Sequence, residues 1–261
     1  MNFPRVFLAA LLLPFVAQAD WKDDLSPPKP GSFPMLEPLH AHYRFGWSKF
    51  EAGEADVVFG RTRDGSLLLS ATGGSTGFPR SLWSLDASHF AIADARTLRP
   101  VELEQWEIYS GEKGFFKVRF EDEQLYKFHQ TWPPDKNPPK DKRFKLPYPL
   151  DLQTALFYVR SQRMGPGDSY QFVVFPASSA YLAKLTVVER EKITVGAGSF
   201  PAIKCSLALK HISKKGALEP HDTFKSATLW VSDDTRRLLL RVEAEIKAGK
   251  VWTELESVKF P

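Results

Sequence analysis

Cysteine is almost absent from this sequence: Cys205 is the single one among 261 residues. An internal disulfide is therefore excluded, and the fold must be stabilised by side-chain packing. Cys205 alternates in phase with the apolar residues Ile203, Leu207 and Leu209. We expect it to be buried as a small apolar side chain rather than to be a reactive thiol.

Long apolar runs are also missing, except at the N-terminus. A short basic start, residues 1–5, precedes the run Val6–Val16, which is too short to cross a bilayer, and Ala17-Gln18-Ala19 has the small-x-small pattern of a cleavage site. This predicts a signal peptide over residues 1–19, cleaved after Ala19, and a soluble protein in the periplasm or outside the cell. No lipid-attachment cysteine follows the run, and no transmembrane segment is expected in the mature chain.

A concentrated block of one charge sign is missing as well. The 35 Lys and Arg residues nearly balance the 31 Asp and Glu residues and are spread along the chain, which argues against a nucleic-acid partner. The densest basic stretch, residues 133–149, has five basic and two acidic side chains among many prolines. It could contact anionic headgroups or an acidic partner. The interpretation that we favour is a solvated, stiff connection.

What the chain does contain is alternation of apolar and polar residues with a period of two. In residues 41–47, Ala, Tyr, Phe and Trp alternate with polar residues and glycine, and the same pattern recurs at 116–121 and 238–246. Turn sequences such as Arg63-Asp64-Gly65 separate these runs. The pattern predicts an all-β, mainly antiparallel fold, built as a single strongly curved sheet or an open β-barrel.

Proline and helix signals divide the chain further. Residues 20–38 hold five prolines and are predicted to be a Pro-rich leader, followed by a single antiparallel β domain over residues 39–261. One amphipathic helix is predicted near residues 151–164, because Asp151 is a suitable N-cap and apolar residues follow at helical spacing. We expect this helix to pack across the sheet.

Two short motifs suggest chemistry. Gly73–Gly77 matches the G-x-S-x-G nucleophile elbow, but Phe78-Pro79-Arg80 stands where the following helix should begin, so we interpret the glycines as a bend. His40 and His42 lie on one face of a strand, yet the sequence gives no reason to bring a third ligand such as Asp56 or His129 beside them. We therefore expect surface histidines, with neither a metal site nor a cofactor.

Several longer segments carry a family resemblance. They are the strand Tyr43–Trp47 with Ala52–Ala55 after it, Leu146–Asp151, Gly198–Lys204, and Leu229–Asp234 with residues 238–245 after it. Over residues 39–258 the chain resembles the exported bacterial proteins grouped as domain of unknown function 3108. The resemblance implies a signal-bearing, mainly antiparallel β domain with one helix, and it brings no established catalytic residues to carry over. A more distant, architectural similarity is to the half-barrel carriers that move lipoproteins through the periplasm.

These observations favour a non-enzymatic protein of the cell envelope. The first hypothesis is that it binds an apolar or amphipathic, lipid-like small molecule between the sheet and the helix, at Tyr43, Phe45, Trp47 and Leu156. The alternative is a scaffold or assembly factor with a packed interior, which binds another envelope protein through its β surface. An exported hydrolase is a third hypothesis, and it would need converging polar residues that the sequence does not reveal. A cavity beside those four residues would favour the first.

Overall fold

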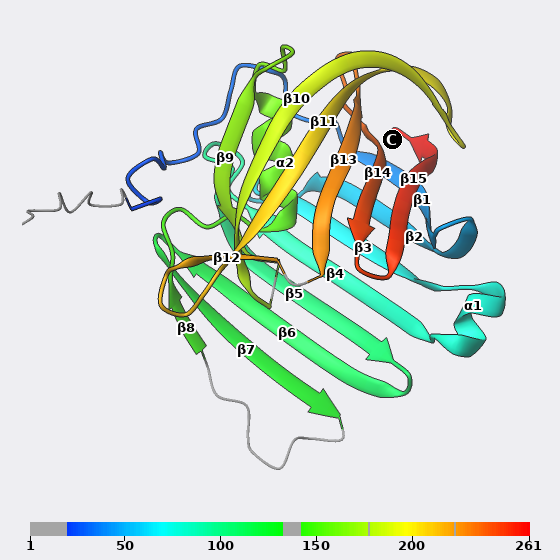
Figure 1. The fold of residues 1–261 in the computed structure, drawn as a ribbon, viewed down its shortest axis with the longest axis horizontal. Helices are drawn as coiled ribbons and strands as arrows, with labels where there is room; N and C mark the ends of the chain where they lie inside the picture. Colours follow the sequence, from blue (N-terminus) through cyan, green and yellow to red (C-terminus); the bar gives the residue numbers. More distant parts are fainter. Residues whose placement is uncertain (1–19, 133–141, 177, 222) are drawn as a thin grey trace, which may run out of the picture.

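The computed structural model describes residues 20–132, 142–176, 178–221 and 223–261. Within these residues, fifteen strands belong to one sheet (Figure 1). The strands of the first half are β1 Leu39–Trp47, β2 Phe50–Arg61, β3 Leu67–Ser75, β4 Leu85–Ala93, β5 Pro100–Tyr109, β6 Glu112–Glu121, β7 Gln124–Trp132 and β8 Lys142–Lys145. Those of the second half are β9 Ser169–Val174, β10 Ala180–Val195, β11 Gly198–Ile212, β12 Leu218–Pro220, β13 Phe224–Ser232, β14 Leu239–Ile246 and β15 Gly249–Lys259.

The sheet is antiparallel and does not close. Its strand order is β8-β7-β6-β5-β4-β3-β2-β1-β15-β14-β13-β11-β10-β9, and β12 pairs with β11 beside this path. The two halves of the chain therefore meet where β1 pairs with β15, and β8 and β9 end the sheet. The predicted fold class, a strongly curved antiparallel sheet or open barrel, is confirmed.

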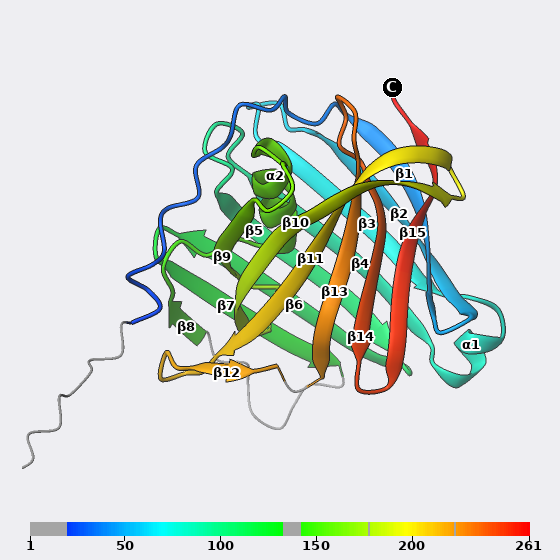
Figure 2. The ribbon, with the colours of Figure 1, turned by 45° about the horizontal axis from the view of Figure 1, so that its top comes forward.

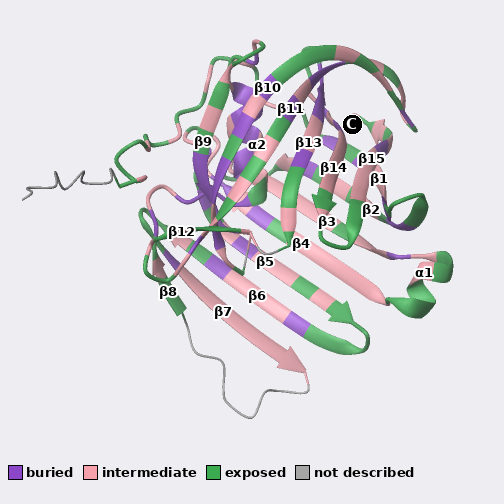
Figure 3. Cartoon of the chain, in the orientation of Figure 1, coloured by how far each residue is buried: buried purple, intermediate pink, exposed green. Residues whose placement is uncertain are grey.

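The predicted alternation decides which side chains face the interior. On β1, Leu39 and Ala41 are buried, whereas His40 between them is exposed. Buried and exposed residues alternate in the same way along other strands (Figure 3). Three clusters of apolar side chains fill the interior, and each contains fully buried residues, such as Leu240, Ile203 and Val118 respectively.

Helix α2, Leu152–Ser161, begins at the predicted N-cap and lies inside the curve of the sheet (Figure 2). The side chain of Asp151 accepts a hydrogen bond from Thr154 N, and the Thr154 hydroxyl accepts one from Asp151 N, which makes a capping box. The helix joins the two halves of the sheet, because Phe157 packs against Phe59 on β2 and Val159 packs in the cluster built on β9, β10 and β11. None of the described helices is long and apolar enough to cross a membrane.

Cys205 is fully buried on β11, as the alternation predicts. Burial raises the pKa of its thiol to about 12, so the reactive thiolate is disfavoured.

The Pro-rich segment 20–38 has no strand or helix among its residues, all of which are described. It runs along the outside of the molecule and past the end of α2 (Figure 2). Trp21 Nε1 donates a hydrogen bond to Gly216 O at 2.8 Å, and Phe33 N donates one to Ser161 O at 3.1 Å. The segment is therefore held against the domain at both of its ends.

Candidate apolar binding groove

A groove of about 860 Å³ lies at one end of the molecule. It is formed by the β1–β2 hairpin, the β14–β15 hairpin and a second helix, α1, at Gly77–Leu82 (Figure 1). Its lining residues are Phe45, Gly46, Trp47, Phe50, Glu51, Ala52, Phe78, Pro79, Leu82, Trp83, Val242, Ala244, Ile246, Ala248, Val251, Trp252 and Thr253. A volume of this size matches the range of small-molecule sites, roughly 300–1,000 Å³.

The two hairpins are fastened to each other by the polar atoms of their tryptophans. Trp47 Nε1 donates to Ala248 O at 2.8 Å, and Trp252 Nε1 donates to Ser48 O at 3.1 Å. Ser48 N in turn donates to Lys250 O at 2.7 Å. Because both indole N–H groups are satisfied by turn carbonyls, the indole rings present apolar surface to the groove.

Helix α1 is anchored by its polar groups and leaves its apolar groups outside. Thr76 N donates to Ala52 O at 2.9 Å, and Arg80 forms a bidentate pair with Asp86 at 2.8 and 2.7 Å. Phe78 and Leu82 are 75% and 76% exposed. Large apolar side chains held in water in this way are typical of a binding surface.

The position of α1 corrects one expectation from the sequence. A helix does follow Gly73–Gly77, because Pro79 is tolerated in the first turn of a helix. The serine of the motif is nevertheless 2% exposed, and Ser75 Oγ accepts a hydrogen bond from Leu85 N at 3.0 Å. A nucleophile elbow requires an exposed hydroxyl, so the role of Ser75 that the geometry supports is to tie β3 to β4.

Polar groups contribute little to the groove. Glu51 is the one charged residue among its described lining residues. Its carboxylate accepts a hydrogen bond from Arg44 at 3.1 Å, and the same guanidinium also pairs with Glu254 at 3.2 Å and Glu256 at 2.8 Å. Apart from Glu51, a bound apolar chain would cover no charged residue of the lining.

Two of the four ligand-binding residues predicted from the sequence, Phe45 and Trp47, line the groove. Tyr43 lies deeper on the same face of β1, where its hydroxyl donates to Leu239 O at 2.9 Å and burial raises its pKa. Leu156 is partly exposed on α2 and is not among the groove's lining residues. The groove thus brings Phe45 and Trp47 together with α1, rather than with α2.

A second hollow, of about 230 Å³, continues past the ring of Phe45 along the inner face of the sheet. The strand register sets Ala55 opposite Gly73 and Gly73 opposite Ala87, so a row of small residues leaves this space. Glycine is also required at Gly53, where a Cβ would lie 2.4 Å from the Phe45 ring.

The far end of this second hollow is polar and holds His89 and Gln105. Burial lowers the pKa of His89, and its interactions with Gln153 and Gln105 oppose that effect. The second hollow is therefore mostly apolar, with two polar side chains at the end away from Phe45.

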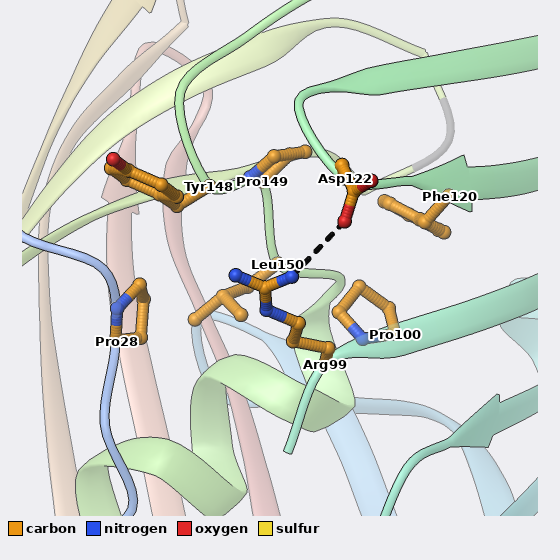
Figure 4. Close-up of a pocket in the computed structure, with 8 residues that line it drawn as sticks. All are labelled: Pro28, Arg99, Pro100, Phe120, Asp122, Tyr148, Pro149 and Leu150. Carbon is orange, nitrogen blue, oxygen red and sulfur yellow. Dashed lines mark hydrogen bonds and ion pairs between the residues drawn. The ribbon is translucent and has the colours of Figure 1, made fainter. Parts of the chain in front are cut away.

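Helix α1 was not predicted from the sequence, and neither was a binding role for Phe50, Phe78, Leu82 or Trp83. A usable signal was present: three large apolar residues, Phe78, Leu82 and Trp83, stand in a connection between strands, where polar residues are the rule. By contrast, a cavity lined by Pro28, Arg99 and Tyr148 holds about 30 Å³, enough for a water molecule but not for a ligand (Figure 4).

The structure places Asp56 beside the two histidines on β1, a contact that no sequence pattern indicated. The register places His42 opposite Asp56 on β2, and one oxygen, Asp56 Oδ1, lies 3.2 Å from both His40 Nε2 and His42 Nδ1. No group of three or more His, Cys, Asp or Glu residues in the described part of the chain has an arrangement that could hold a metal ion.

One solved structure has a similar fold. It is a β-barrel-like protein of the domain of unknown function DUF1849 from Brucella abortus, and its sequence is 8% identical to this one. The match covers 87% of this chain and 99% of the Brucella chain, with a TM-score of 0.57. A candidate lipoprotein from Parabacteroides distasonis is 10% identical over 88% of this chain and 99% of its own, with a TM-score of 0.34.

A candidate exported protein with a YmcC-like fold from Bacteroides fragilis is 12% identical over 88% of this chain and 99% of its own, with a TM-score of 0.30. No curated protein sequence is significantly similar to this chain. The profile of one family, described as protein of unknown function (DUF3108), matches residues 41–256. The chain therefore belongs to the DUF3108 family.

Proposed function

We propose that the protein is an exported, non-enzymatic binding protein that holds the apolar part of an amphipathic, lipid-like molecule in the groove. The observation that carries the proposal is the groove itself, with about 860 Å³ of space bounded almost entirely by apolar side chains. Burial of an alkyl chain there would gain about 0.8 kcal/mol for each methylene. The proposal includes export by the signal peptide and residence in the periplasm.

The exposure of the rim supports a ligand rather than simple core packing. Phe50 is 67% exposed and Trp47 is 49% exposed, and both belong to the groove together with Phe78 and Leu82. A bound alkyl chain would cover this apolar surface and so remove the free-energy cost of its exposure to water. His89 and Gln105, at the far end of the second hollow, offer hydrogen-bonding groups for the head of the same molecule.

The experiment is binding of a fluorescent fatty acid to delipidated protein. The variant Phe78→Ser/Leu82→Ser removes two exposed apolar side chains, so its fold should survive, and we expect about tenfold weaker binding. The control is Val101→Ser/Val188→Ser, which changes two exposed apolar residues outside the groove and should bind like the wild type. The proposal fails if delipidated protein takes up no acyl ligand, or if both variants lose binding equally.

The second candidate is a scaffold that binds another envelope protein. The exposure of Phe78 and Leu82 favours it, because a partner could bury α1 as an anchor. The edges of the sheet do not favour it: β8 has four residues, three of them Lys or Arg, and β9 is covered where Leu150 pairs with Val174. A stable complex that forms with delipidated protein and is lost in Phe78→Ser/Leu82→Ser, without any acyl binding, would establish this candidate instead.

A further inference from the structure

A second large opening, of about 760 Å³, is lined by residues of β8 and of the turn between β11 and β12. These elements lie at the other end of the molecule from α1 (Figures 1 and 2). We call this opening the basic cleft. Its seven Lys and Arg residues are Lys22, Lys127, Lys142, Arg143, Lys145, Lys214 and Lys215. No Asp or Glu is found among the described residues that line it.

The charges reach the cleft from four separate parts of the chain. Lys127 is on β7, and Lys142, Arg143 and Lys145 are on β8. Lys214 and Lys215 form the turn between β11 and β12, and the bond from Trp21 to Gly216 brings Lys22 to the same turn. Only the folded chain assembles this cluster, so it differs from a run of basic residues that stays solvated along one loop.

Within the cluster, two lysines face each other directly. The register of β7 and β8 pairs Lys127 with Lys142, and like charges in this position destabilise a sheet. Burial lowers the pKa of Lys127, and the charge of Lys142 lowers it further. Of the seven side chains, Lys22 alone has an ion-pair partner among the described residues, Asp20 at 3.4 Å. The neighbouring residues 133–141 contain two Lys and two Asp and so add no net charge to the chain.

The floor of the cleft is apolar and includes Trp21, Phe144, Leu146 and Ile212. Cationic side chains around apolar surface match a phosphate group attached to a hydrocarbon, and clusters of about four to eight Lys and Arg residues are typical of anionic-lipid recognition. We propose that the basic cleft binds the phosphate of an anionic phospholipid headgroup. This site is separate from the groove and does not depend on the function proposed for it.

The test is sedimentation of the purified protein with vesicles of phosphatidylcholine, with and without phosphatidylglycerol. The protein should bind the anionic vesicles only, and salt should weaken the binding. The variant Lys214→Glu/Lys215→Glu changes two exposed turn residues and should bind at least about 25-fold more weakly, because the loss of each lysine costs about fivefold and each new carboxylate adds repulsion. The matched control Lys192→Glu/Lys259→Glu changes two exposed lysines outside the cleft and should bind like the wild type.

A second variant separates a binding role from a structural one. Lys142→Gln removes one member of the like-charge pair, so the protein should melt at a higher temperature while it binds the anionic vesicles about fivefold more weakly. A lysine kept for stability would give a lower melting temperature. Phe78→Ser/Leu82→Ser in the groove should keep the preference for anionic vesicles. The proposal for the groove and the proposal for the basic cleft can therefore fail independently, and the experiments distinguish the two failures.

The source of the phosphate is tested with soluble glycerol phosphate. If it binds without vesicles and Lys214→Glu/Lys215→Glu weakens that binding, the cleft is a phosphate site but the lipid assignment is overturned. The whole proposal is overturned if anionic vesicles do not bind, or if the cleft and control variants lose binding to the same extent, because the net charge alone would then explain the result.

Discussion

The buried N-cap of α2 makes the stability of the protein depend on pH in a specific way. Asp151 is fully buried, and burial raises the pKa of its carboxyl to about 6, although hydrogen bonds from Thr154 oppose the effect. Asp151 Oδ1 accepts from Thr154 N and Oγ1 at 2.7 and 2.9 Å, whereas Oδ2 has no hydrogen-bond partner among the described residues. Only one of the two oxygens of the ionised carboxylate therefore accepts hydrogen bonds.

The sign of the effect follows from linkage. Between pH 3.8 and about 6 the folded chain keeps this proton while the unfolded chain has released it. Stability from the neutral carboxyl is thus fully present below about pH 4 and is lost as the pH rises through about 6. The difference between about 6 and the usual 3.8 corresponds to about 3 kcal/mol, because one pKa unit is worth about 1.4 kcal/mol.

The perturbation is Asp151→Asn, which keeps a good N-cap but cannot ionise. Its new amide N–H groups lack an acceptor, and that cost is the same at every pH. The free energy of unfolding of the variant, minus that of the wild type, should therefore rise by about 3 kcal/mol from about pH 4 to about pH 7. Urea unfolding at both pH values measures it, and Asp151→Ser should repeat the trend. A difference that stays constant with pH would refute the reasoning.

Three further predictions concern the packing and processing of the chain. Gly31→Ala should destabilise the protein by about 1–3 kcal/mol in urea unfolding, because its Cβ would lie 2.1 Å from Ser161 O, whereas Gly60→Ala, with open space around it, should be nearly neutral. Native Cys205 should react slowly with thiol reagents and quickly after denaturation; rapid labelling of the folded protein would contradict its burial. Intact-mass analysis of the exported protein should give a chain that begins at Asp20, and a retained Met1 or an added lipid mass would contradict cleavage after Ala19.

Local sequence patterns predicted the strands and helices of this fold more reliably than the contacts between them. The alternation around Tyr43 and the N-cap at Asp151 identified β1 and α2, because each depends on neighbours in the sequence. The pairing of β1 with β15 joins residues more than two hundred positions apart, and no local pattern encodes it. For the same reason the sequence did not reveal Asp56 beside His40 and His42: their contact depends on the β1–β2 register.

The basic cleft could not be predicted for a related reason. The sequence shows Lys142, Arg143 and Lys145 as part of one basic connection, for which a solvated loop is the simplest explanation. Lys127 and Lys214 lie in other segments, and each is unremarkable where it stands. Their charges form one cluster only in the folded chain, where the antiparallel pairing of β7 with β8 and the turn after β11 place them around one opening.

An alternation with a period of two predicts which face of a strand a residue is on, but not how deeply the residue is buried. Leu39 and Trp47 are on the same face of β1, yet they are 6% and 49% exposed. The difference comes from α2, whose Phe157 packs on Phe59, the register partner of Leu39, while the end of β1 at Trp47 faces the groove. Apolar residues of the inner face are thus core where the helix covers them and candidate ligand contacts where it does not. That distinction explains why Phe45 and Trp47 belong to the groove and Tyr43 to the core.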